Sequence, residues 1–319
     1  MKLNIKDRKI LHALDLNSRA SLNEIARKAG VSKQVADYRL KRLIRDKIIK
    51  QFYTAVNFSK LGYTQYKLYL KFQNAGIAKE HEIIDYWANC KNSAWVASCR
   101  GRWDIAVSIL AKNIGELGKI LDAFNSKYGL FILEKDILIT QLSPVFTKAY
   151  LAENAEKSKF SYGEKIGDYK LDAIDEGILK VLSSNARITI LELMDKSGLT
   201  RDIIAYRLKK FAKEGIIRQY RILIDLQKIE HKLYKIMLRL HSLTAEKEKA
   251  LMAYVAAHPN GVQYLKTAGS WDAELEFEVK DEDEIYALLL EIRAKFSDVI
   301  RDCETLLIPE EHKLNYFPF

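Results

Sequence analysis

The chain has 319 residues, more than one hydrophobic core usually supports, so we expect at least two domains. Hydrophobic residues make up 48% of the chain and charged residues 29%, and no apolar run is long enough to cross a bilayer, which excludes a membrane-spanning protein. The N-terminus is charged where a secretory signal would be apolar, so we expect a cytoplasmic protein, and the formal net charge of +10 favours a polyanionic partner.

The first predicted elements, within residues 1–60, are three helices and a strand. A short amphipathic helix comes first. The capping-box pattern from Ser21 to Glu24 then opens a second helix, Gly30 ends it, and Ser32 starts a third almost at once. Two helices joined by such a short glycine turn predict a helix-turn-helix, and the β-branched and aromatic run IIKQFYTAV that follows predicts a wing hairpin.

Residues 61–148 predict a second domain, with elements in the order β-α-β-β-α-β. This order is typical of a ferredoxin-like sandwich, an α+β fold in which helices cover one face of an antiparallel sheet. Another part of the molecule must cover the other face of that sheet. Residues 149–168 are polar with little apolar periodicity, and they predict a linker.

The chain then repeats itself, because residues 3–150 run parallel to residues 171–318 at a constant shift of 168 positions. The repeat predicts a second winged helix-turn-helix in residues 169–228 and a second ferredoxin-like domain in residues 229–319. We expect the two sheets to pair within one chain. Whether the chain also forms homo-oligomers stays open. The first part of the repeat matches Leu3, Asp7, Ile10, Leu11, Leu14, Asn17 and Arg19 with Leu171, Asp175, Ile178, Leu179, Leu182, Asn185 and Arg187.

The third helix of each copy carries residue types that suit the major groove of double-stranded DNA. In copy one, a helical period places Ala36, Leu40, Leu43 and Ile44 on one side and polar residues on the other. Flanking cations such as Arg39 are expected to hold phosphates. The alternative is a solvated basic face. The predicted DNA-contacting residues are Ser32, Lys33, Gln34, Tyr38, Arg39, Lys41, Arg42, Arg45, Arg201, Tyr206, Arg207, Lys209, Lys210 and Lys213.

The positive charge is concentrated in these segments. Residues 1–58 hold 14 Lys and Arg against 5 Asp and Glu, whereas residues 169–226 hold 11 against 8. The second unit also has Asp202 where the first has Gln34, and phosphates repel an aspartate. We therefore expect the first unit to supply most of the DNA affinity.

A G-x-W-D element recurs in both ferredoxin-like domains, as Gly101, Trp103 and Asp104 in copy one. Copy two has Gly269, Trp271 and Asp272. One interpretation is a tight turn in which the aspartate accepts backbone N–H groups and the tryptophan packs in the core. The other is direct contact with an effector, so these six residues are the candidate effector-binding residues.

No residues in the sequence predict catalysis, a cofactor or a metal site. Cys90, Cys99 and Cys303 are widely spaced and fit neither a disulfide framework nor paired metal knuckles. No nucleophile elbow or phosphate loop occurs. We expect a protein that is not an enzyme.

The helix-turn-helix pattern resembles the Lrp/AsnC family of feast/famine transcription regulators. The following unit, with its G-x-W-D element, resembles that family's sensing and assembly domain. The resemblance implies a sequence-specific DNA-binding regulator whose sensing domains pair sheet against sheet and bind an amino acid or similar small effector near the interface. The tandem fusion departs from the family's usual single copy. The matching residues are Asp7, Ile10, Leu11, Asn17, Arg19, Glu24, Ala26, Gly30 to Ser32, Tyr38 to Leu43, Ile48 and Ile49.

Two other functions stay open. Siroheme decarboxylases resemble the same family and also occur as two-copy chains. The resemblance would imply histidine and arginine at the hairpin from Cys99 to Trp103, where this sequence has arginine but no histidine. A ligand sensor or scaffold without DNA binding is the third possibility. The basic third helix favours the regulator, because a decarboxylase has no need of it.

Overall fold

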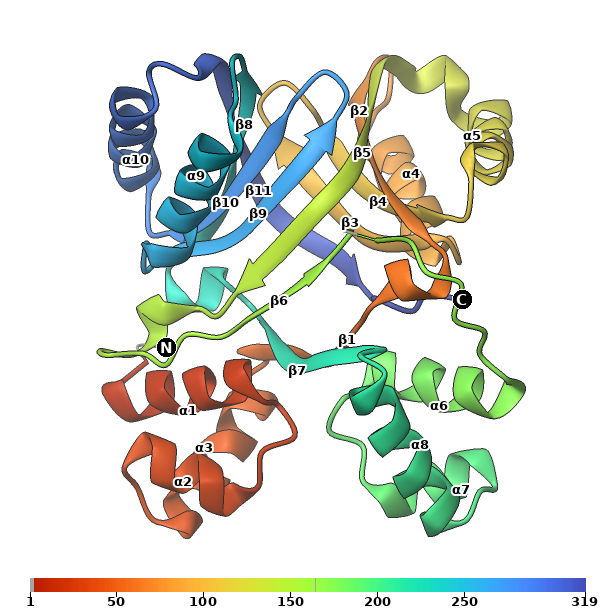
Figure 1. Ribbon diagram of the computed structural model, residues 1–319, viewed down its shortest axis with the longest axis vertical. Coiled ribbons are helices and arrows are strands. Elements are labelled where there is room, and N and C mark those ends of the chain that lie inside the picture. Colours follow the sequence, from red (N-terminus) through yellow and green to blue (C-terminus); the bar gives the residue numbers. More distant parts are fainter. Residues whose placement is uncertain (1–2, 164) are drawn as a thin grey trace.

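The computed structural model describes residues 3–163 and 165–319, which form two parts at opposite ends of the molecule (Figure 1). One end holds two three-helix units. The other end holds a strongly twisted sheet with four helices on its outside. Each half of the chain contributes one three-helix unit and half of the sheet, as the internal repeat predicts.

The first three-helix unit forms as its local signals predict. The Ser21 hydroxyl accepts a hydrogen bond from the N–H of Glu24, and the Glu24 carboxylate accepts one from the N–H of Ser21. Gly30 then ends the second helix in the left-handed conformation, with φ 66°, which glycine adopts without strain. The three helices are α1 (Ile5–Leu16), α2 (Leu22–Ala29) and α3 (Lys33–Arg45).

The second unit repeats the same construction. Thr189 and Glu192 form the capping box, and Gly198 ends the helix with φ 68°. Its helices are α6 (Ala173–Ser184), α7 (Ile190–Ser197) and α8 (Arg201–Lys213). The two predicted helix-turn-helix units are confirmed.

The predicted wing hairpins need a correction. The strand β1 (Ile49–Val56) pairs with β7 (Ile217–Ile224) of the other copy in an antiparallel two-stranded sheet, and among the described residues neither strand folds back on its own unit. After β1 the chain passes through the short 3-10 helix η1 (Phe58–Leu61) into the large sheet, so no second strand is available for a hairpin. The two copies therefore share this ribbon.

Both ferredoxin-like units have the predicted β-α-β-β-α-β order. Copy one contains β2 (Thr64–Phe72), α4 (Ile77–Asn89), β3 (Ser93–Arg100), β4 (Ile105–Ala111), α5 (Ile114–Tyr128) and β5 (Ile132–Phe146). Copy two contains β8 (Lys232–Leu240), α9 (Ala245–Ala257), β9 (Gly261–Ala268), β10 (Ala273–Val279), α10 (Glu282–Lys295) and β11 (Ile300–Leu314).

The two sheets join into one closed barrel, because the last strand of each copy is shared. The long strand β5 pairs with β2 and then with β9 of the other copy, and β11 pairs with β8 and then with β3. The pairing of β5 with both β2 and β9 closes eight strands in the order β2-β4-β3-β11-β8-β10-β9-β5. Each open sheet face thus turns inward and is covered by the other copy, as expected.

The segment predicted as a polar linker, residues 149–168, carries regular structure of its own. It contains the 3-10 helix η3 (Ala149–Leu151) and the strand β6 (Lys159–Tyr162), which pairs with the end of β5. Phe160 and Tyr162 are buried, so the linker is anchored beside the barrel. Among the described residues, the helices are all too short or too polar to traverse a bilayer.

Candidate DNA-binding surface and effector region

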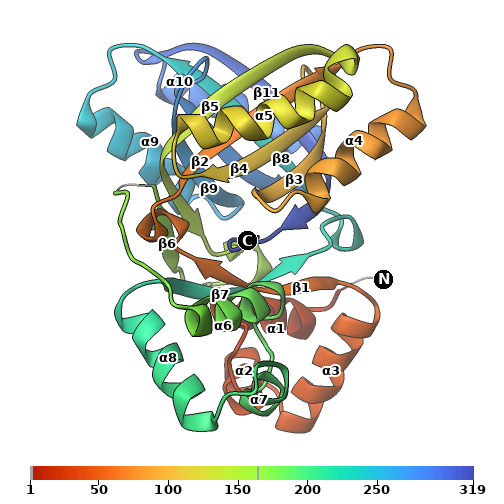
Figure 2. The ribbon, with the colours of Figure 1, turned by 90° about the vertical axis from the view of Figure 1, so that its right-hand side faces the viewer.

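The helices α3 and α8 lie on opposite sides of the same end of the molecule, with α2 and α7 between them (Figure 2). A reciprocal exchange holds the two units together. The Arg19 guanidinium donates to the Ile188 carbonyl at 2.9 Å, and Arg187 donates to the Ala20 carbonyl at 3.2 Å. Together with the pairing of β1 and β7, these hydrogen bonds hold α3 and α8 at the same end of the molecule.

The outward face of α3 is polar and exposed. Tyr38 is 66% exposed, and Gln34, Lys41 and Arg45 also lie in solvent. Lys41 pairs with Asp37 at 2.7 Å on the same face, an exposed pair that contributes little and can be exchanged for a phosphate. Ser32 and Lys33 are exposed at the start of the helix, where the Ser32 hydroxyl caps it.

The inward face of α3 is formed by Ala36, Leu40 and Leu43, which are buried as predicted. Ile44, predicted on this face, is 42% exposed. The helix ends at Arg45, and Ile48 after it fills the core instead.

In α8 the same positions are exposed. Tyr206 is 65% exposed, and Arg201, Lys209 and Lys213 lie beside it in solvent. Asp202 is exposed in the first turn of the helix. The second surface is therefore similar in shape but less positive.

Four of the predicted DNA-contacting cations face their own unit. Arg39 and Arg42 lie 2.8 and 2.7 Å from the buried carboxylate of Asp7 on α1. Arg207 and Lys210 lie 2.7 and 3.7 Å from Asp175, which occupies the same place in copy two. A buried carboxylate needs such partners, so these cations join the third helix to the first. The sequence analysis missed this role. The recurrence of Asp7 as Asp175 at the 168-residue shift is the signal that could have indicated it.

The G-x-W-D elements form turns that rest on the other copy. A Cβ added to Gly101 would lie 3.3 Å from Leu306 on β11, and one added to Gly269 would lie 2.6 Å from Leu138 on β5. Both glycines have positive φ, 138° and 151°, so glycine suits both the conformation and the close approach.

The other residues of these turns also have structural contacts. Asp104 accepts from the N–H of Phe72 at 2.7 Å, and Asp272 accepts from the N–H of Leu240 at 2.7 Å. Trp103 and Trp271 are buried inside the barrel. These contacts fit the packing interpretation, and effector contact at the turns stays a prediction.

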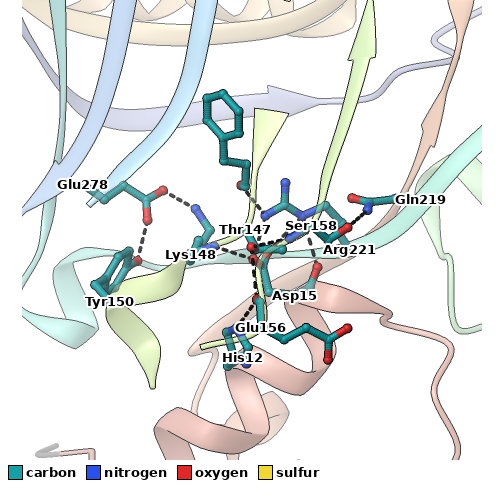
Figure 3. A network of polar contacts seen from close by, with 11 residues as sticks. His12, Asp15, Thr147, Lys148, Tyr150, Glu156, Ser158, Gln219, Arg221 and Glu278 are labelled. Atoms are coloured by element: carbon teal, nitrogen blue, oxygen red, sulfur yellow. Dashed lines mark hydrogen bonds and ion pairs between the residues drawn. The ribbon is translucent and has the colours of Figure 1, made fainter. Parts of the chain in front are cut away.

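A buried charge network, which the sequence did not indicate, connects the first unit to the barrel (Figure 3). Arg221 on β7 donates to Asp15 on α1 through two nitrogens, at 2.6 and 3.1 Å, and to the Phe146 carbonyl at 2.9 Å. Lys148 donates its backbone N–H to Asp15 at 2.8 Å and pairs with Glu278 on β10. Burial alone would lower the pKa of Arg221, but the Asp15 carboxylate raises it overall.

The equivalent place beside the second helix-turn-helix unit has other residues. The positions equivalent to Asp15, Arg221 and Lys148 are Ser183, Tyr53 and Tyr316. Tyr53 and Tyr316 stack with their ring centroids 5.7 Å apart. Charges therefore connect one unit to the barrel and aromatic rings connect the other.

Comparison with known proteins adds independent evidence. A family model described as winged helix-turn-helix DNA-binding matches residues 3–50 and 171–218, which are the two three-helix units. An HTH-type transcriptional regulator of Pyrococcus furiosus is 30% identical over 121 residues, covering 37% of this chain and 80% of that protein. The HTH-type transcriptional regulator FL11 of Pyrococcus abyssi is 30% identical over 124 residues, covering 39% of this chain and 81% of the relative.

A solved structure of similar fold matches both copies at once. The siroheme decarboxylase NirDL has a TM-score of 0.63 and 12% identity, covering 99% of this chain and 94% of that one. This likeness concerns the fold alone.

Two helix-turn-helix units that expose basic helices at one end of a shared barrel define a DNA-binding transcription regulator. The chain belongs to the same family of HTH-type transcriptional regulators, in a tandem form with two copies, as its resemblance to Lrp/AsnC regulators predicts.

Proposed function

We propose that this chain is a sequence-specific regulator that places α3 and α8 on one DNA duplex and whose binding is modulated by a small metabolite. The observation that carries the proposal is the presentation of both exposed helix faces at the same end of the molecule. Gln34 offers an amide that can pair with a base edge, and Lys41 and Arg45 offer cations for the backbone.

The test is selection of genomic fragments by the full chain, followed by footprinting. Two helices on one side of a duplex should protect two segments separated by whole helical turns. Tyr38→Ala with Tyr206→Ala should weaken binding at least tenfold. The matched control, Lys119→Ala with Lys249→Ala, changes exposed residues of α5 and α9 and should have little effect. A full chain that selects no fragment would favour a sensor without DNA binding.

The modulation is tested by repeating the binding measurement with single amino acids. At least one should change the DNA affinity, because a ligand shifts an equilibrium only when it prefers one state. If no amino acid changes the affinity, the amino-acid form of the proposal fails and DNA binding is unaffected.

A siroheme-decarboxylase-like enzyme is the second candidate, and the likeness of fold over both copies favours it. In this chain the corresponding hairpin carries Arg100 and Arg102, and Arg102 pairs with Glu134 at 2.5 Å. Anaerobic incubation with siroheme, followed by mass spectrometry, tests the enzyme directly. A product lighter by one carbon dioxide would show catalysis, and unchanged siroheme would exclude this activity.

A further inference from the structure

The inside of the barrel contains two lysines at equivalent positions of the two copies, Lys67 on β2 and Lys235 on β8. Lys235 is fully buried and has two carboxylate partners on β10. Its ammonium lies 2.8 Å from Glu274 and also contacts Glu276, and the Tyr69 hydroxyl donates to Glu274 at 2.7 Å. Lys235 is therefore a charge that the protein itself compensates.

Lys67 lies near this cluster, but among the described residues it has no ion pair of its own, because Glu274 and Glu276 both pair with Lys235. The positions equivalent to Glu274 and Glu276 in copy one are Ala106 and Ser108. The Lys67 ammonium donates to the neutral Ser108 hydroxyl at 3.1 Å and lies 4.3 Å from the centroid of the Trp95 ring. Among the described residues, no carboxylate lies within ion-pair distance of Lys67, although the side chain is 96% buried.

A carboxylate in the same region lacks a cation. Glu311, on the far half of β11, accepts from the indole N–H of Trp95 at 2.7 Å. No Lys or Arg in the described parts of the chain lies within ion-pair distance of its carboxylate. Burial raises the pKa of Glu311, as expected of a carboxyl group without a cation. Trp95 thus lies between an unpaired ammonium and an unpaired carboxylate.

Lys67, Trp95 and Glu311 line one cavity of about 90 Å³. The side-chain oxygen of Gln65 also belongs to this lining, and it is buried without a hydrogen-bond partner among the described residues. The other charged lining residues are paired, Lys148 with Glu278, Arg221 with Asp15 and Glu276 with Lys235. A volume of this size holds roughly six to nine waters, or a ligand with a similar number of non-hydrogen atoms.

We propose that this cavity binds a small zwitterion, with its carboxylate at Lys67 and its ammonium at Glu311. The Gln65 oxygen would accept a hydrogen bond from that ammonium. A ligand with only negative charge would meet the unpaired Glu311, and one with only positive charge would meet Lys67. A molecule with both charges satisfies both side chains, as a buried charge requires.

The site lies apart from the G-x-W-D turns and between the barrel and the β1–β7 ribbon. Tyr53 of β1 and Arg221 of β7 line the same cavity, and these strands continue from the helix-turn-helix units. A ligand in the cavity would contact strands that carry both DNA-binding units. The proposal therefore gives the effector of the proposed function a chemical class and a place, and only its regulatory consequence rests on that function.

The experiment is calorimetry and thermal unfolding of the full chain without DNA, using glycine, alanine, serine, proline and valine. Each is compared with its N-acetyl derivative, which lacks the ammonium, and its amide, which lacks the carboxylate. At a hundredfold excess over Kd, a bound zwitterion should raise Tm by about 5 °C. The acetyl and amide forms should bind at least tenfold more weakly. A panel in which no zwitterion binds, or in which all three forms bind equally, overturns the proposal.

Variants locate the site. Lys67→Met and Glu311→Gln should each weaken zwitterion binding at least tenfold, while Lys135→Met and Glu310→Gln, which change exposed residues of β5 and β11, should leave it unchanged. Unaltered circular dichroism and cooperative unfolding of each variant verify that it folds. Binding that survives both cavity variants but is lost in Asp104→Asn would overturn the proposal in favour of the turns. Because no DNA is present, these outcomes are separate from the test of DNA recognition.

Discussion

At the scale of single residues, Lys67 makes the stability of the barrel depend on pH. Burial, with Lys235 nearby, lowers the pKa of Lys67 from 10.5 to about 8. The unfolded chain binds this proton more tightly, so the cost of burying the charged lysine is fully present below pH 8 and is lost as pH rises toward 10.5.

Urea unfolding from pH 7 to pH 10.5, without ligand, checks this dependence. The free energy of unfolding of the wild type should rise relative to that of Lys67→Met over this range, because the variant carries no charge at this position. The other titrating groups are common to both proteins and cancel in the comparison. A difference that stays constant with pH would show that the Lys67 pKa is not lowered.

The pair of Asp15 and Arg221 is the second prediction at this scale. Both side chains are at most 2% exposed, so Arg221→Tyr leaves a buried carboxylate without its cation and should cost about 3–5 kcal/mol of unfolding free energy. The double variant Asp15→Ser with Arg221→Tyr installs the residue types of the equivalent positions, Ser183 and Tyr53, and should cost less than the single variant. Urea unfolding measures both, and a double variant less stable than Arg221→Tyr alone would contradict the argument.

At the scale of elements, the predictions from sequence succeeded where the signals are local. Ser21, Glu24 and Gly30 lie within one helix and its caps, so their spacing predicts where that helix begins and ends. Asp15 and Arg221 are 206 residues apart, and their contact depends on strands exchanged between copies, which no local pattern encodes. The pairing of β1 with β7 was missed for the same reason, because the amino-acid composition of a strand does not show which strand it pairs with.

Arg39 is predicted from its place on the helix to contact DNA, and the structure gives its side chain a buried partner. A helical period places it beside the outward face of α3, but its guanidinium lies 2.8 Å from the buried Asp7. Arg39→Ala should lower the unfolding free energy by about 1.5–3 kcal/mol, the range for a hydrogen bond to a charged group. Lys41→Ala, on the exposed face, should change it by less than about 0.5 kcal/mol.

The salt dependence of DNA binding separates the two roles. At temperatures where both variants are folded, Arg39→Ala should keep the wild-type slope of log affinity against log salt, and Lys41→Ala should flatten that slope by about 1. A flatter slope for Arg39→Ala would show that Arg39 does reach a phosphate.

At the scale of the whole molecule, the two copies are fused in one chain, and their sequences have been able to diverge. A dimer of identical chains would place the same residues on both sides, whereas here Tyr53 and Ser183 occupy the places of Arg221 and Asp15. The interior diverges as well, because Lys235 has two carboxylate partners, whereas Lys67 forms no ion pair with any residue that the structure describes. The barrel therefore contacts the two helix-turn-helix units through different residues.

The DNA-binding surfaces should be unequal for the same reason. The first unit carries 14 Lys and Arg against 5 Asp and Glu, and the second carries 11 against 8. Asp202 is exposed where α8 begins, at the place that Gln34 occupies in α3, and it would lie close to the phosphates. The electrostatic part of DNA affinity follows the number of phosphates that cations neutralise, so most of it should come from α3.

Paired substitutions measure this difference. Lys41→Ala with Arg45→Ala should flatten the slope of log affinity against log salt by about 2 and weaken binding at physiological salt, because two phosphate contacts are lost. Lys209→Ala with Lys213→Ala, the same change in α8, should flatten it by less. Equal changes from the two pairs would show that the units contribute alike despite their charges. If neither pair changes the slope, DNA does not lie on these helix faces, because four exposed cations cannot be removed from a DNA-binding surface without releasing fewer counterions.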